Sequence, residues 1–64
     1  MYHNNMRTFR EKQGLRLSDL SEKTNLSIGY LCHLEKGSRK NPSVDVMDKI
    51  SKALNKSVSE IFFN

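Results

Sequence analysis

Apolar residues recur every three or four positions along most of the chain, which is the spacing of helices buried on one side. The first such stretch predicts a helix from about residue 4 or 5 to residue 13. Met6, Phe9 and Arg10 would face inward. Gly14 is expected to end this helix, because glycine adopts the left-handed backbone conformation at little cost.

Residues 17–37, LSDLSEKTNLSIGYLCHLEKG, predict two short amphipathic helices joined by a tight break. Ser18 is expected to cap the first helix and Ser27 the second, which begins at residue 28, because a serine oxygen can accept an unpaired backbone N–H. Asn25 stands where the chain leaves the first helix, and Gly37 ends the second. The predicted inner faces consist of Leu17, Leu20, Thr24, Leu26, Leu31 and Leu34.

The remaining segment predicts two more helices. Pro42 lies just before or at the start of a fourth helix, with Ser43 near its cap, and Asn55 ends that helix. Ser57 would cap a short fifth helix. The expected inward residues are Val44, Met47, Ile50 and Leu54 on the fourth helix and Val58, Ile61 and Phe62 on the fifth. With no strand pattern or repeat, the sequence predicts an all-α fold in one domain, residues 1–64.

Several short motifs resemble the phage-repressor (Cro and XRE-type) helix-turn-helix family from about residue 6 to residue 62. They are Arg10, GLRLSDL, KTNLS, YLCHLEKG, Asn41-Pro42-Ser43 and ALNKSVSEIF. The resemblance implies a compact five-helix, lambda-repressor-like domain, with the helix-turn-helix at about residues 17–36 and the third helix in the major groove of DNA. It also implies a partly buried ion pair between Arg10 and Glu35.

The chain departs from this family at four positions. Ser21 stands where the family usually has alanine, and Asn25 where it usually has glycine. Ile28 and Gly29 occupy positions at which some relatives carry glutamines, so a glutamine-to-adenine contact is not expected here.

The positive charge lies in the half of the chain that contains the proposed helix-turn-helix. The net charge is +4, with eight Lys or Arg against four acids in residues 1–40 and three against three in residues 41–64. Lys36, Arg39 and Lys40 cluster after the third helix, where they can meet phosphates. The alternative is a solvated surface that keeps a small domain soluble. For Arg7 and Lys12, the phosphate contact and the solvated surface are equally favoured.

The outward face of the third helix predicts the site. Residues three and four apart share a face, so with the leucines inside, the other side points to DNA. The expected base-reading residues are Ser27, Ile28, Gly29, Cys32 and His33. The expected contacts to the DNA backbone are Arg16, Leu17, Tyr30, Lys36, Arg39, Lys40 and Asn41.

Three of these residues also have plainer interpretations. Ile28 suits a thymine methyl, or it belongs to the core of a slightly rotated helix. Gly29 leaves room for DNA, or it has no role, although it destabilises the helix by roughly 1 kcal/mol relative to alanine. His33 contacts a base, or it is simply exposed.

Other kinds of chemistry are not supported by the sequence. Cys32 next to His33, with His3 far upstream, is not a metal-binding spacing, and adjacent helical residues do not meet as a nucleophile and base. We therefore expect no enzyme, no metal, no cofactor and no small-molecule ligand. No apolar run is long enough for a membrane, and the single cysteine fits a reducing, cytoplasmic location.

The predicted function is a sequence-specific transcriptional regulator that binds double-stranded DNA as a homodimer. Val46, Phe63 and the carboxyl end are the candidate dimer surface. Because Met1 opens the chain and the fifth helix is complete, a stand-alone regulator is favoured over a fragment. The alternative function is a protein-interaction module, such as an antitoxin or adaptor, on the same helical scaffold without base reading.

Overall fold

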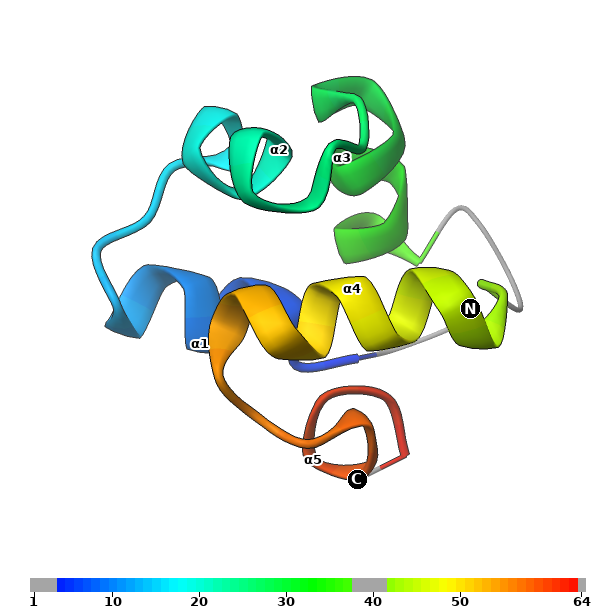
Figure 1. The fold of residues 1–64 in the computed structure, drawn as a ribbon. Coiled ribbons are helices and arrows are strands. Elements are labelled where there is room, and N and C mark those ends of the chain that lie inside the picture. Colours follow the sequence, from blue (N-terminus) through cyan, green and yellow to red (C-terminus); the bar gives the residue numbers. More distant parts are fainter. Residues whose placement is uncertain (1–3, 38–41, 64) are drawn as a thin grey trace.

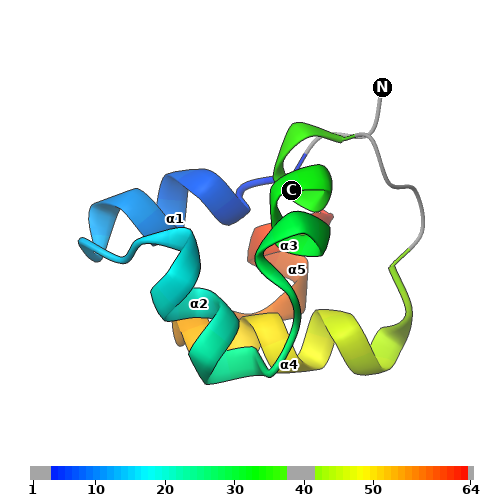
Figure 2. The ribbon, with the colours of Figure 1, turned by 90° about the horizontal axis from the view of Figure 1, so that it is seen from above.

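The computed structural model describes residues 4–37 and 42–63, and within them the regular structure consists of five helices without a strand. The helices are α1 (Met6–Lys12), α2 (Leu17–Thr24), α3 (Ile28–Lys36), α4 (Val44–Leu54) and α5 (Val58–Phe62). In Figure 1, α2 and α3 lie above α1 and α4, and α5 lies below. Figure 2 shows the same molecule from above, with α3 to the right of α1 and α2 and drawn over α5. The predicted all-α, five-helix fold is confirmed.

Every helix contributes at least one side chain to a single core. The buried apolar residues are Met6, Leu20, Leu31, Leu34, Ile50, Leu54, Ile61 and Phe62. All of them were expected to face inward. Apolar burial stabilises a fold by roughly 25 cal/mol per Å². Because this core is small, the apolar side chains that each helix adds are important for the stability of the domain.

Serine hydroxyls begin three of the helices, as predicted. Each accepts the backbone N–H of the residue three positions later: Ser27 from Tyr30 at 3.1 Å, Ser43 from Val46 at 3.2 Å and Ser57 from Glu60 at 3.0 Å. The carboxylate of Glu60 also accepts the Ser57 N–H at 3.0 Å, which completes a capping box.

Left-handed residues end three of the helices and closely follow a fourth, at the four positions where the sequence was expected to end them. Asn25 has a φ of 65° at the end of α2, and Gly37 has a φ of 77° at the end of α3. Asn55 ends α4 with a φ of 56°. Gly14, at a φ of 70°, follows α1 by two residues.

The start of α2 differs from the prediction. The helix begins at Leu17, with Arg16 rather than Ser18 at the N-cap position. The backbone N–H of Arg16 donates to Asp19 Oδ2 at 2.8 Å, and its guanidinium lies 3.2 Å from the same oxygen. Because Asp19 satisfies this amino end from inside the first turn, no serine cap is required there.

Two other expectations need correction. α1 covers Met6–Lys12 and is thus shorter than the predicted residues 4 or 5 to 13. The side chain of Asn4 already accepts the Met6 N–H at 3.0 Å, so the helix begins after it. Val44 is 77% exposed, because the buried stripe of α4 runs along Ile50, Ser51 and Leu54 and Val44 lies beside it in the first turn.

No helix among the described residues is both long enough and apolar enough to cross a bilayer.

Candidate nucleic-acid interface

The outer face of α3 is open. Leu31 and Leu34 lie in the core, and the opposite side of the helix presents exposed residues. Those exposed residues are Ser27, Ile28, Gly29, His33 and Lys36. Five of the residues predicted from the helical spacing therefore lie together on one accessible surface.

Ile28 lies at the first position of α3 and is 47% exposed. It is also not one of the half-buried apolar residues that pack against the core. Its interpretation as a core residue of a rotated helix is therefore not supported. An exposed isoleucine at this place is free to contact an apolar group of a partner.

Gly29 is not required by the packing of the protein. A methyl group built at this position would find no other atom within 4 Å, and the backbone is not in the left-handed region. The fold would thus accept a larger residue, so the only crowding that glycine can relieve at this position is with a partner.

Cys32 is half-buried rather than fully outward. It borders a hollow that is lined by Arg7, Arg10, Leu17, Cys32, Glu35 and Lys36. The thiol thus lies at the margin of the open face, on the side of α3 that turns toward α1. This placement leaves it less available to a partner than its neighbour His33.

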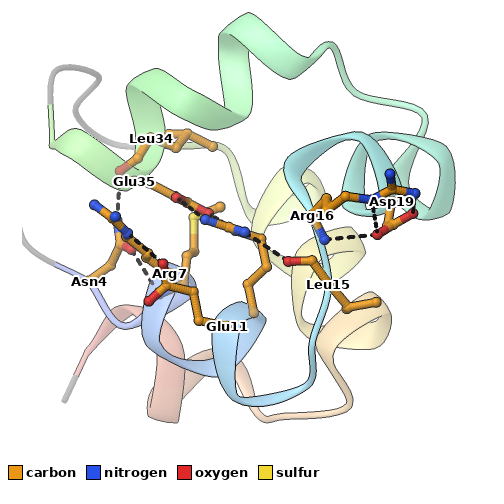
Figure 3. A network of polar contacts seen from close by, with 10 residues as sticks. Asn4, Arg7, Glu11, Leu15, Arg16, Asp19, Leu34 and Glu35 are labelled. Carbon is orange, nitrogen blue, oxygen red and sulfur yellow. Dashed lines mark hydrogen bonds and ion pairs between the residues drawn. The ribbon is translucent and has the colours of Figure 1, made fainter.

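Arg10 and Glu35 form the ion pair that the resemblance implied. Arg10 Nε lies 2.6 Å from Glu35 Oε2, and Arg10 Nη2 lies 3.1 Å from Glu35 Oε1. The two side chains are only 11% and 6% exposed, and Arg10 Nη1 also donates to the carbonyl of Leu15 at 2.8 Å. The hydrogen bond to Glu35 raises the pKa of Arg10, although burial opposes this. The pair joins α3 to α1 and to the loop before α2 (Figure 3).

The described residues that were expected to contact the DNA backbone lie at the amino end of α2 and on α3. Lys36 and Arg16 are exposed, whereas Leu17 and Tyr30 are half-buried and pack against the core. Arg16 is engaged with Asp19, and the hydrogen bonds from Arg16 hold the pKa of that carboxyl below its usual range. The predicted contacts at Arg39, Lys40 and Asn41 lie outside the described residues.

Sequence reasoning missed the roles of three amide side chains. Asn4, Asn5 and Gln13 each donate a hydrogen bond to a carbonyl near the carboxyl end of another helix. A pair of asparagines at the start of the predicted first helix was a visible signal for local capping. Their distant partners were not visible, because they lie 30 to 55 residues along the chain.

Three comparisons agree about the relationship of this chain to known proteins. A model of the helix-turn-helix family matches residues 6–61. The chain is 34% identical over 53 residues to the HTH-type transcriptional regulator SinR of Bacillus subtilis, covering 83% of this chain and 48% of SinR. It is 32% identical over 57 residues to the regulator SlrR of the same organism, covering 89% of this chain and 38% of SlrR. The chain thus spans about half the length, or less, of these relatives.

A solved structure has the same fold. The crystal structure of the clp gene regulator ClgR from C. glutamicum superposes with a TM-score of 0.76 at 35% sequence identity. The match covers 84% of this chain and 69% of that one.

Proposed function

Because the chain belongs to the phage-repressor-like (Cro/XRE-type) helix-turn-helix family, we propose that it is a DNA-binding transcriptional regulator that reads sequence through α3. The observation that carries the proposal is the open outer face of α3, where an isoleucine and a glycine are exposed without serving the core. A face of this size and composition fits the major groove, which admits one helix. The function is regulation rather than catalysis, and the place of action is the cytoplasm.

Base reading falls to five residues of α3 and its cap. Ile28 would contact a thymine methyl, and the missing side chain of Gly29 would let the DNA approach closely. His33 can donate to guanine or accept from a donor, depending on its tautomer. Ser27 would reach a base edge or phosphate from the helix start, and Cys32 would add a weaker contact from the margin.

Phosphate contacts would hold α3 in the groove. Lys36 is an exposed cation in the last turn of α3, and Leu17 offers its backbone N–H at the amino end of α2. Arg16 would exchange Asp19 for a phosphate, and Tyr30 would contribute its hydroxyl. Arg39, Lys40 and Asn41 complete the proposed backbone set.

We propose a homodimer that binds an inverted repeat with half-sites about 34 Å apart. Phe63 is 67% exposed after α5 and is the best candidate for the dimer surface. Val46 was a second candidate, but it packs against the core and would contribute only its outer edge.

Selection of binding sites from random duplex DNA, followed by sequencing, tests the proposal. We expect enrichment of a two-fold repeat, which would identify a dimeric regulator and its operator together. Enrichment of a single short site would contradict the dimer and leave base reading intact. No enrichment by the folded protein would contradict base reading and favour the alternative, a protein-interaction module such as an antitoxin or adaptor.

A further inference from the structure

Three carboxamide side chains at the two ends of α1 each hold the carboxyl end of a different helix. They donate hydrogen bonds to backbone carbonyls in the last turns of α3, α5 and α4: Asn4 Nδ2 to Leu34 O at 2.9 Å, Asn5 Nδ2 to Glu60 O at 3.0 Å, and Gln13 Nε2 to Leu54 O at 2.6 Å. The last four carbonyls of a helix have no partner within it, so an external donor is stabilising there. α1 is therefore tied to three helices by the same kind of bond.

The bond from Asn4 is well defined, because both ends of the side chain are engaged. Asn4 Oδ1 accepts the Met6 N–H at 3.0 Å while Nδ2 donates to Leu34 O (Figure 3). These two partners assign the orientation of the amide. The next residue, Asn5, anchors the segment further, since its backbone N–H donates to Ile61 O at 2.7 Å.

α3 is consequently held near its carboxyl end at two adjacent residues. The Leu34 carbonyl is bound by Asn4, and the Glu35 side chain is bound by Arg10. The fully buried Leu31 and Leu34 fix which side of the helix faces the core. The two polar attachments at adjacent residues restrict the rotation of α3 further, and this rotation decides where His33 and Lys36 point.

We infer that Asn4 is a positioning residue for base reading: it sets the orientation of α3 against α1 without contacting DNA itself. The inference rests on the proposed function of α3. Asn5 and Gln13 make the same kind of bond to α5 and α4, and their loss changes stability but not selectivity. The three carboxamides thus supply their own internal comparison.

Asn4→Asp is the decisive variant. It keeps the shape and the acceptor for the Met6 N–H, but replaces the donor to Leu34 O with an oxygen. Gln13→Glu is the matched control, because it makes the same atomic change, adds the same charge and breaks the same kind of bond at α4. Asn4→Ser, which is neutral and too short to reach Leu34, separates the loss of the bond from the added charge.

The first readout is amide hydrogen exchange by NMR in the absence of DNA. We expect exchange in the last turn of α3, including the Gly37 N–H that shares the Leu34 carbonyl at 3.2 Å, to become about three- to tenfold faster in both Asn4 variants. In Gln13→Glu, the change in the exchange rate of these amides should stay within about twofold of the change in the rest of the core. Unchanged exchange in α3 overturns the inference whether or not the protein binds DNA.

The second readout is the ratio of affinities for a selected duplex and a random duplex, corrected for the folded fraction. We expect both Asn4 variants to lower this ratio about three- to tenfold and Gln13→Glu to leave it within about twofold. An unchanged ratio despite faster exchange would make Asn4 merely structural and overturn the inference. If the wild-type protein itself shows no preference for any duplex sequence, the proposed function fails. The exchange result then still decides whether Asn4 positions α3 against α1.

Discussion

Arg10 and Glu35 place opposite charges within the domain, where water has little access to solvate either group. Their bidentate contact and the additional bond to the Leu15 carbonyl offset part of the cost of burying both groups. By contrast, Arg7 and Glu11 form a similar contact at 3.0 Å on the surface, with side chains 70% and 56% exposed. The same pairing therefore has different consequences at the two places.

Glu35→Gln should lower the free energy of unfolding by about 3 kcal/mol, because it leaves the Arg10 charge buried without a counter-ion. Urea denaturation followed by circular dichroism would measure it. Glu11→Gln is the control and should cost less than about 1 kcal/mol, since that pair is exposed. Equal effects of the two substitutions would show that burial does not distinguish the pairs.

His33→Ala tests base reading by a single side chain. His33 is exposed, and alanine favours a helix, so the fold should be preserved. If His33 contacts a base, the variant should lose about 1–3 kcal/mol of affinity for the selected duplex and much less for a random one. Titrations with both duplexes at one salt concentration measure this. Equal loss on both would remove His33 from the base-reading residues.

At the scale of helices, the amino end of α2 depends on a carboxylate instead of a hydroxyl. The hydrogen bonds from Arg16 hold the pKa of Asp19 below its ordinary value of 3.8. Asp19 therefore makes its full contribution to the stability of the folded state at pH values above the pKa that it has in the unfolded chain. This contribution is lost as the pH falls from about 4 through the lower, folded pKa.

Asp19→Asn should accordingly destabilise the domain at about pH 6 and have a smaller effect at about pH 2.5, because the contribution of the wild-type carboxylate falls once the pH drops below its ordinary pKa of 3.8. Thermal unfolding of both proteins at the two pH values would reveal a difference in Tm that narrows on acidification. A constant difference would mean that ionisation of Asp19 contributes nothing to the start of α2.

The helices could be predicted because their signals are local. The caps at Ser27, Ser43 and Ser57 act within three residues, and so do the left-handed ends. The start of α2 was misplaced because arginine gives no capping signal. Val44 was misplaced because periodicity identifies a face but not how far the neighbouring helices cover it.

The candidate site was predicted less completely than the fold. Helical spacing was enough to place Ile28, Gly29 and His33 on the open face of α3, because one helix determines which residues share a side. It could not find Asn4, whose partner Leu34 becomes a neighbour only when α1 packs beside α3. Residues that support a site from another helix are invisible to a pattern read along one helix.

For the molecule as a whole, the excess positive charge and the open face of α3 belong to the same part of the sequence. Lys49 and Lys52 on α4 pair with Asp45 and Asp48 at 3.6 and 3.0 Å, so the cations of this helix are largely balanced. A DNA partner would therefore be attracted mainly toward the first half of the chain.

Lys36→Ala should weaken binding to selected and random duplexes alike and reduce the slope of log affinity against log salt by about one. Lys52→Ala, which removes a lysine of α4 that is paired with Asp48, is the control and should leave the slope unchanged. Titrations at several salt concentrations measure both slopes. An unchanged slope in Lys36→Ala would place Lys36 away from the phosphates.

The three carboxamide bonds at the ends of α1 also bear on the order of events in folding. They join residues that are 30, 41 and 55 positions apart, whereas α2 and α3 are neighbours along the chain and can meet through a short loop. Closing long loops costs entropy before the contacts repay it. The pair α2–α3 can therefore form early and α1 can join last, so that the docking of α1 completes the domain.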